Sequence, residues 1–448
     1  MLVTVVSAMR LAFRENEVYH MKRRKIYRGA LFAILLVVIG GIGFLSYKTM
    51  DSQVPDSIKI VMNREQKLNF SLPLKGQIDG TAVGALSVND KKLNSDKLKL
   101  NFAKPIKFYT EEPGSYKVRL KLFGLLSYKD IRIDVIKEKN LYASGSSVGI
   151  NIKTDGILVL GTGIIGGKDG LNYEPALNIL KSGDYIVAIN DKNVENKKNL
   201  IEMIENCNGN DIQLEVIRNK ERIKLIVKPV LASDGLYKIG AWIRDDTQGI
   251  GTLTYIDEDN YFGALGHGIT DIDTGLLMNV KEGGLYKADI VQINKGAKGT
   301  PGEVVGVIRK NDQDHYGFID KNTKQGIFGK INDSVFNTEE LKKYPMGLKQ
   351  DIKVGEATIL CQVSDQIEEY KIEIEKIELN TENYSKGMVL HVIDKRLLSL
   401  TNGIVQGMSG SPIIQDGKII GAVTHVFVQD STRGYGIFVE NMVKFSDN

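Results

Sequence analysis

Glycines divide the C-terminal half of the chain into short apolar runs, and this pattern restricts the fold more than any other feature. From about Ser233 onward, runs of Val and Ile soon meet a glycine or a polar turn, as in GALGHGITD, EVVGVIR and IIGAVTHVFV. Such runs suit strands and are too short for helices. This part of the chain is therefore predicted to be mainly β, as a barrel or a sandwich.

The size and composition of the chain indicate an ordinary globular protein with several domains. Its 448 residues predict two or three domains, and a net charge of +4 gives no reason to expect nucleic acid as a partner. The two cysteines, Cys207 and Cys361, have neither a metal-ligand nor a redox spacing. We expect no metal and no cofactor, and cores that are stabilised by packing.

One segment near the N-terminus carries no charge. Gly29 to Tyr47 are nineteen uncharged residues, which at about 1.5 Å per residue nearly span the roughly 30 Å hydrocarbon core of a bilayer. Five basic residues precede it, Lys22, Arg23, Arg24, Lys25 and Arg28. Because basic flanks stay in the cytoplasm, residues 1–28 are predicted cytosolic, 29–47 a transmembrane signal anchor, and the remainder extracytoplasmic. A cleaved signal peptide is the alternative.

Residues 55–138 alternate apolar and polar side chains in short runs, such as KLNFSLPL and YKVRLKLFGLL. This alternation is typical of strands with one buried face. A small β domain is predicted here, as a spacer or a docking module between the membrane and the rest of the chain.

The segment 141–231 carries Pro175-Ala176 and then SGDYIVAIN, which begins at Ser182. We expect a helix from Pro175 to near Gly183, followed by a strand. The two motifs resemble the PDZ family, whose bacterial members carry a Pro-Ala helix start and then Gly-Asp-x-Ile-x-x-Ile-Asn.

The PDZ resemblance implies a domain that binds extended peptide ends by adding a strand to a sheet edge. A helix near Lys197 to Asn206 is expected beside the peptide groove. The loop that binds the peptide carboxylate is expected at Ser147, Val148, Gly149 and Ile150. A PDZ fold that only packs against its neighbour is the alternative.

The hexapeptide GMSGSP, from Gly407 to Pro412, is the clearest candidate for chemistry. Its glycines allow a tight turn in which the N–H groups of Gly407 and Ser409 point at one developing oxyanion. The hexapeptide resembles the nucleophile turn of chymotrypsin-like serine proteases, Gly-x-Ser-Gly-Gly-Pro, with Ser411 in place of a glycine. The resemblance implies a C-terminal double β-barrel, residues 233–448.

A serine nucleophile needs a histidine as its base. Among five histidines, His267 is the candidate, because Gly266 and Gly268 flank it and leave its ring free to face a cleft. It also precedes Ser409, as in chymotrypsin-like enzymes. His391 and His425 lie in apolar runs, where a hydrogen-bonded core histidine is the commoner outcome.

A carboxylate normally orients the histidine of such a site. Asp394 is our candidate, because it keeps the order His, Asp, Ser along the chain. Asp271 and Asp273 lie close to His267 in the sequence and are the alternatives.

The order of anchor, PDZ and protease, with GALGHGITDIDTG and GIVQGMSGSPIIQDGKIIGAVTHVFV, is similar to the stage IV sporulation protein B family of signalling peptidases. The HtrA quality-control proteases place the protease before the PDZ domains. The resemblance implies a serine endopeptidase that uses His267, Asp394 and Ser409. It also implies that the peptidase processes itself and cleaves a membrane-bound regulator of an intramembrane protease.

The family further implies a forespore membrane location and signalling between forespore and mother cell that activates sigma factor K. The PDZ domain is implied to bind the chain's own N-terminal segment and the targets. Two other functions stay open, namely a non-catalytic PDZ scaffold and a general HtrA-like quality-control protease.

Overall fold

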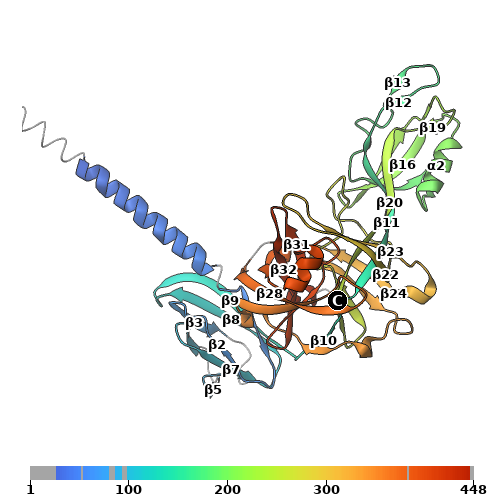
Figure 1. Ribbon diagram of the computed structural model, residues 1–448. Helices are drawn as coiled ribbons and strands as arrows, with labels where there is room; N and C mark the ends of the chain where they lie inside the picture. The colour runs from blue at the N-terminus through green and yellow to red at the C-terminus, as the bar shows by residue number, and fades with distance from the viewer. Residues whose placement is uncertain (1–26, 52–53, 80–85, 93–97, 381–382, 444–448) are drawn as a thin grey trace, which may run out of the picture.

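The computed structural model describes residues 27–51, 54–79, 86–92, 98–380 and 383–443 (Figure 1). The predicted cytosolic segment, residues 1–28, lies outside the described residues except at its end. Within the described ranges the chain is mainly β, with one N-terminal apolar helix and two β-barrels. The predicted fold class is confirmed.

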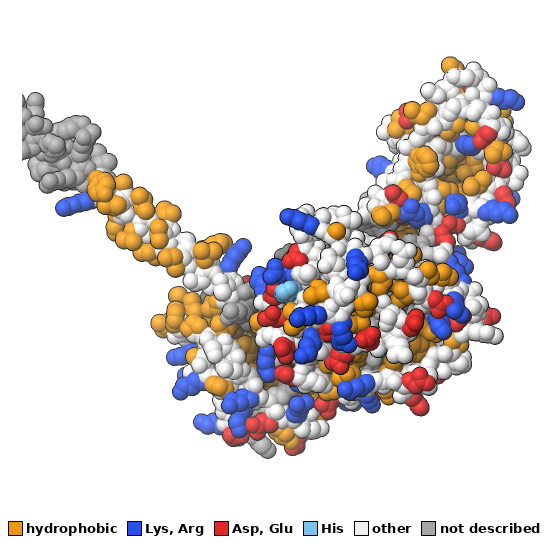
Figure 2. All heavy atoms as spheres, in the orientation of Figure 1, with side chains coloured by type: hydrophobic (Ala, Val, Ile, Leu, Met, Phe, Trp, Pro, Cys, Tyr) orange, Lys and Arg blue, Asp and Glu red, His pale blue; other side chains and the backbone are white. Residues whose placement is uncertain are grey.

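The N-terminal helix, Tyr27–Asp51, extends away from the β domains (Figure 1). It is the one described helix long and apolar enough to cross a membrane, and its apolar stretch is fully exposed. Figure 2 shows hydrophobic side chains along most of its visible face. Its 25 residues correspond to about 37 Å, which exceeds the roughly 30 Å hydrocarbon core.

Two sheets share one core in the N-terminal β domain, which follows the apolar helix. Their strand orders are β1-β9-β8-β3-β6 and β2-β7-β4-β5, and alternate residues of each strand, such as Leu74, Ile78 and Phe108, enter the core. The strands are β1 (Ser57–Val61), β2 (Gln66–Leu68), β3 (Leu74–Asp79), β4 (Leu86–Val88), β5 (Lys91–Lys92), β6 (Leu98–Asn101), β7 (Ile106–Thr110), β8 (Gly114–Leu122) and β9 (Leu126–Ile136).

Six strands close into a first barrel in the order β11-β22-β24-β25-β21-β20, because β20 pairs with both β21 and β11. They are β11 (Ser147–Thr162), β20 (Ala241–Asp257), β21 (Tyr261–Ala264), β22 (Glu282–Asn294), β24 (His315–Thr323) and β25 (Gly326–Ile331). Attached to it are β10 (Asn140–Ala143), β23 (Glu303–Ile308), β26 (Lys343–Pro345), η1 (Asp312–Asp314) and η2 (Thr338–Glu340). The short helix η3 (Lys349–Asp351) lies against the second barrel, where the Lys349 N–H donates to the Glu440 carboxylate.

A second closed barrel has the strand order β27-β28-β29-β32-β31-β30. Its elements are β27 (Gly355–Gln362), β28 (Ile367–Ile377), β29 (Met388–Val392), β30 (Pro412–Gln415), β31 (Lys418–Phe427) and β32 (Asp430–Phe438), with η4 (Tyr384–Lys386), α3 (Lys395–Thr401) and α4 (Val439–Val443). The interior is filled by branched aliphatic side chains and by Tyr370 and Phe438.

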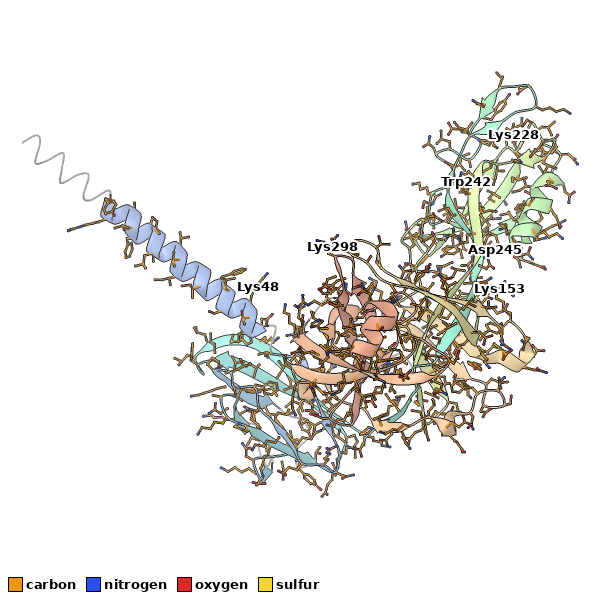
Figure 3. All side chains as sticks on the ribbon, viewed as in Figure 1. Lys48, Lys153, Lys228, Trp242, Asp245 and Lys298 are labelled. Carbon is orange, nitrogen blue, oxygen red and sulfur yellow. The ribbon has the colours of Figure 1, made fainter. Side chains whose placement is uncertain are left out.

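The PDZ-like module lies at the far end of β11 and β20, the two longest strands (Figure 1). Lys153 and Asp245 mark the arm between barrel and module, and Trp242 lies on the module side (Figure 3). The elements are β12 (Ile165–Gly166), β13 (Asn172–Tyr173), β14 (Tyr185–Ile189), β15 (Lys192–Asn193), α2 (Lys197–Glu205), β16 (Ile212–Arg218), β17 (Glu221–Val227), β18 (Val230–Leu231) and β19 (Tyr237–Lys238).

Two expectations for this module are wrong. Ser147 to Ile150 are not a loop, because they lie in β11, where β20 and β22 pair with them from both sides and bury Val148 and Ile150. We predicted these residues in the PDZ domain, whereas their pairing makes them part of the first barrel. The helix expected from Pro175 is a series of turns, because Asn178 adopts a left-handed φ of 61°.

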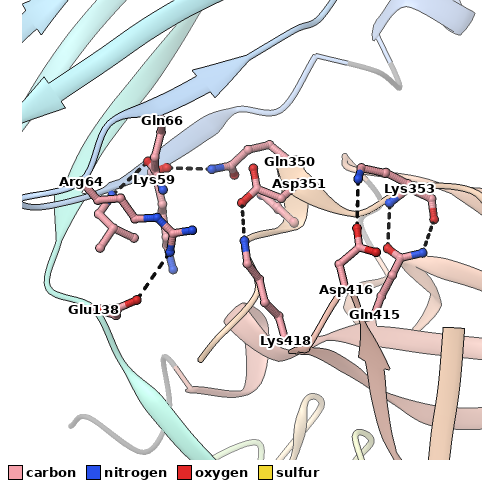
Figure 4. A network of polar contacts seen from close by, with 12 residues as sticks. Lys59, Arg64, Gln66, Glu138, Gln350, Asp351, Lys353, Gln415, Asp416 and Lys418 are labelled. Carbon is pink, nitrogen blue, oxygen red and sulfur yellow. Dashed lines mark hydrogen bonds and ion pairs between the residues drawn. The ribbon is translucent and has the colours of Figure 1, made fainter. Parts of the chain in front are cut away.

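Polar contacts join the N-terminal β domain to the second barrel. The Gln350 side chain donates to the Lys59 carbonyl at 2.7 Å (Figure 4), and the Lys59 ammonium lies 3.6 Å from the buried Glu440 carboxylate. Beside them, Lys418 pairs with Asp351 at 3.4 Å. The hairpin of β30 and β31 is thereby connected to the domain that follows the N-terminal helix.

Candidate active site

A cleft of about 860 Å³ lies where the two barrels meet. The first barrel contributes His267, which follows β21, and the second contributes Ser409, which precedes β30. His425 of β31 lines the same cleft. The two residues that the sequence predicts as base and nucleophile are therefore brought together.

The turn that carries Ser409 is held by Thr252 of β20. The Thr252 N–H donates to the Ser409 carbonyl at 2.9 Å, and its hydroxyl donates to the Gly407 carbonyl at 2.8 Å. Thr252 itself is buried. Both carbonyls are thus bound to the first barrel, and these two hydrogen bonds hold the turn against it.

The N–H groups of Gly407 and Ser409 have no hydrogen-bond acceptor among the described residues. Their neighbours do, since the Met408 N–H donates to Val405 and the Gly410 N–H to Val423. Two unpaired N–H groups at the wall of a cleft, one of them that of the serine itself, can bind a developing negative charge. The glycine pattern predicts this role for the two N–H groups, and the role stays a prediction.

The surroundings of Gly410 and Ser411 explain why these two residue types occur in the turn. Gly410 has φ +100°, and a Cβ there would lie 2.0 Å from the Thr252 carbonyl oxygen, so the two barrels could not approach this closely with any other residue. The buried Ser411 hydroxyl donates to the Met408 carbonyl at 2.7 Å. A serine in place of the second glycine therefore adds a hydrogen bond inside the turn.

His267 is held by its own loop. Its Nδ1 lies 2.9 Å from the Gly268 carbonyl oxygen, a contact in which Nδ1 carries the proton and Nε2 is left as the base. Burial lowers the pKa of His267 below its ordinary value, and the hydrogen bond to Gly268 opposes this only in part. The ring is therefore neutral and able to accept a proton at neutral pH.

Strand β31 contacts both the candidate nucleophile, Ser409, and the candidate base, His267. The Ser409 hydroxyl donates to the Thr424 carbonyl at 2.6 Å, and the His425 ring centroid lies 4.9 Å from that of His267. Desolvation, followed by the neighbouring His267 and Lys386, lowers the pKa of His425. The cleft therefore holds two neutral imidazole rings side by side, and the serine hydroxyl is engaged by a backbone carbonyl.

Asp394 does not line this cleft. It caps the N-terminus of α3, where its carboxylate accepts from the Arg396 N–H at 2.9 Å and the Lys371 N–H at 3.2 Å, and it pairs with the Arg396 guanidinium at 2.9 Å. The guanidinium is the main reason that the pKa of Asp394 falls to about 2. Asn383 and Ser385, which precede the other end of β29, line the cleft instead.

The alternative carboxylates are also engaged elsewhere. Asp271 is buried and accepts hydrogen bonds from Thr274 and Arg244, while Asp273 lies 2.8 Å from the same guanidinium. Burial alone would raise the pKa of Asp271, but the hydrogen bonds from Thr274 and Arg244 lower it overall. None of the three aspartates forms a hydrogen bond or an ion pair with His267 within the described residues.

A second cavity, of about 470 Å³, lies in the PDZ-like module. One wall is α2, as the sequence predicts, with Leu200, Ile201 and Ile204. The other walls are residues 163–165 and 236–243, which include Trp242 (Figure 3). The groove is apolar and lies away from Ser147 to Ile150.

Sequence reasoning missed Thr252 and set His425 aside. Nothing in the local sequence marks Thr252, because its role depends on its hydrogen bonds to the turn around Ser409, which lies far away in the sequence. His425 lies in the run GAVTHVFV directly after the nucleophile hairpin, and this position was an available signal. No group of three or more His, Cys, Asp or Glu within the described ranges could hold a metal ion.

Known proteins resemble parts of the chain. A model of the family described as SpoIVB peptidase S55 matches residues 235–443. Among solved structures, the PDZ domain of the SdrC-like protein from Listeria monocytogenes has 21% identity, covers 20% of this chain and 87% of its own, and gives a TM-score of 0.16. No curated protein matches the chain.

Two solved proteases also match in part. The HtrA-type protease AlgW, solved with a decapeptide, has 12% identity over 48% of this chain and 53% of its own, with a TM-score of 0.24. The Rv3671c protease in its inactive form has 11% identity over 44% of this chain and 81% of its own, with a TM-score of 0.20. Residues 235–443 are thus similar to the SpoIVB peptidase S55 family, and this match identifies the chain as a serine peptidase.

Proposed function

We propose that the chain is a membrane-tethered serine endopeptidase with Ser409 as its nucleophile. His267 takes the serine proton as the hydroxyl attacks a peptide carbonyl, and later gives it to the leaving amine. The N–H groups of Gly407 and Ser409 hold the oxyanion. The observation that carries this proposal is the meeting of His267, Ser409 and two unpaired N–H groups in one cleft.

The Gly268 carbonyl does the work that a carboxylate does in other serine peptidases. It holds Nδ1–H of His267 and so keeps Nε2 free to accept the proton. The family resemblance assigns Asp394 to this role. We propose that Asp394 acts indirectly, since it caps α3, and α3 leads through residues 402–406 into the nucleophile turn.

Substrate binding releases the nucleophile from β31. Strand β30 pairs with β31 only as far as Pro412 and Ala422, so one edge of β31 from Thr424 onward faces the cleft. An extended substrate can pair with this edge. Its N–H would replace the Ser409 hydroxyl on the Thr424 carbonyl, and the hydroxyl would then turn to His267.

The biological role that we propose is signalling between forespore and mother cell during sporulation. In this role the peptidase processes itself and cleaves a membrane-bound regulator of an intramembrane protease, which leads to activation of sigma factor K. The match to a SpoIVB family and the N-terminal apolar helix support this proposal. The helix would anchor the chain in the forespore membrane, with its β domains in the space between the two membranes.

The apolar groove beside α2 would hold an extended apolar peptide. We propose the chain's own N-terminal segment and the membrane-bound target as its occupants. The support is the shape and lining of the groove, which joins a helix to strands as a PDZ groove does, and the exposed Trp242 and Ile201 at its rim.

Self-cleavage tests the proposal. Full-length chain in detergent should form new N-termini, which mass spectrometry identifies, while Ser409→Ala should stay intact and keep its melting temperature. Cleavage in Ser409→Ala would refute the assignment. Broad degradation of unfolded casein would instead favour a quality-control protease, and no cleavage of any kind in the unaltered chain would favour a scaffold.

A further inference from the structure

The turn between β8 and β9 exposes a cluster of large apolar side chains. Phe123 is 65% exposed, Leu125 83% and Leu126 65%. These residues are neighbours in one hairpin turn, so they form a single patch and not scattered surface positions. Contiguous exposed apolar groups of this kind mark a surface that contacts a partner or a membrane.

The hairpin lies against the C-terminal end of the apolar helix. The Tyr128 ring of β9 is 5.7 Å from the Tyr47 ring of the helix, and the Tyr128 hydroxyl donates to the Asp51 carboxylate at 2.7 Å. Met50 packs on the same core as Leu122. Figure 1 shows β8 and β9 ending beside the helix, and Figure 2 shows hydrophobic side chains gathered there.

The turn is at a depth where it can reach lipid. The uncharged run ends at Tyr47, and a tyrosine at this point is typical of the membrane interface. Tyr128 contacts Tyr47 and is three residues from Leu125. At roughly 3.3 Å per residue the turn extends about 10 Å from Tyr128, and interfacial segments bury their apolar side chains about 5–10 Å deep.

Positive charges surround the patch. Lys48 ends the uncharged run (Figure 3), Lys121 precedes the turn, and the Lys75 side chain packs against Gly124 at its tip. None of the three has a carboxylate partner among the described residues. Unpaired ammonium groups beside apolar side chains suit an interface with anionic lipid headgroups.

We propose that the β8–β9 turn inserts into the leaflet from which the helix emerges, as a second membrane contact. The inference rests on the proposed membrane anchor. A single helix would leave the domains free to tilt, whereas two contacts hold the N-terminal β domain at a set height and orientation. The second barrel is attached to that domain, so the cleft is held where membrane-bound substrates lie.

Tryptophan quenching tests this proposal in the full-length chain. The single native tryptophan is removed by Trp242→Phe, and one new tryptophan is then placed by Phe123→Trp in the turn, Phe44→Trp in the helix, or Phe318→Trp on β24. Phe318 is 56% exposed and gives a matched control on the first barrel. Each variant is reconstituted into phosphatidylcholine–phosphatidylglycerol vesicles with and without acyl-chain bromine.

We expect strong quenching and a blue-shifted emission for Phe123→Trp and Phe44→Trp, and neither for Phe318→Trp. Adding Leu125→Glu and Leu126→Glu to Phe123→Trp should remove the quenching without lowering the melting temperature. Quenching of Phe44→Trp alone would overturn the second contact and leave the anchor intact, and would point to a protein partner for the patch. Quenching of neither would overturn the anchor itself, and equal quenching of Phe318→Trp would show unspecific adsorption.

Discussion

Thr252→Val tests whether the first barrel holds the nucleophile turn. The exchange keeps the shape of the side chain and the backbone hydrogen bond from the Thr252 N–H to the Ser409 carbonyl. It removes only the hydroxyl that donates to the Gly407 carbonyl at 2.8 Å. The position is buried, so water cannot easily replace that donor.

The size of the effect follows from one hydrogen bond. A neutral hydrogen bond contributes about 0.5–1.5 kcal/mol net, and about 1.4 kcal/mol corresponds to a tenfold change in an equilibrium. If the bond selects the turn in which the Gly407 and Ser409 N–H groups face the cleft, its loss should lower the active fraction about twofold to tenfold. Substrate affinity at the distant PDZ-like groove should not change.

The second-order rate constant for labelling of Ser409 by a fluorophosphonate measures this fraction without knowledge of the substrate. Thr254→Val is the matched control, because Thr254 lies on the same strand, is fully buried, and its hydroxyl has no hydrogen-bond partner within the described residues. We expect a slower rate for Thr252→Val and an unchanged rate for Thr254→Val. Equal rates in the two variants would refute the reasoning.

Three further predictions concern protonation and stability. Because burial lowers the pKa of His267, the labelling rate should stay high as pH falls through 6.5 and decline only below it; a midpoint at or above 6.5 would contradict this. Asp394→Ala should lower the free energy of unfolding by about 0.5–2 kcal/mol, because it removes the cap of α3. Asp394→Asn can still cap the helix and should lower this free energy by less. Denaturant titration measures both variants, and an equal loss of stability in the two would argue against capping. Arg218→Ala leaves the buried Asp184 unpaired and should destabilise the PDZ-like module by about 3–5 kcal/mol, seen as faster hydrogen exchange in β14 and β16; unchanged exchange would contradict it.

The catalytic candidates could be predicted because their chemistry depends on local sequence. A nucleophile turn needs glycines at set positions around Ser409, and a base that faces a cleft benefits from flanking glycines, as at His267. These requirements are visible without knowledge of the fold. The alternation in residues 55–138 likewise reports one buried face per strand, whatever the strands pair with.

The remaining features depend on pairings between distant segments. Val148 pairs with Lys287 and Gly251, which lie far away in the sequence. The residues around Ser147 to Ile150 therefore give no local sign that this segment belongs to a barrel. Asp394 is a different case, because an aspartate before KRLLSLT is also the pattern of a helix N-cap. The order of residues along the chain suggested a triad, while the local pattern already indicated the cap.

The central claim is that Ser409 is a nucleophile activated by His267. The most direct measurement is labelling of the full-length chain with a fluorophosphonate, followed by mass spectrometry of the modified peptide. The account predicts a single adduct on Ser409, absent from Ser409→Ala and strongly reduced in folded His267→Ala. An adduct on another residue, or undiminished labelling of Ser409 in folded His267→Ala, would contradict it.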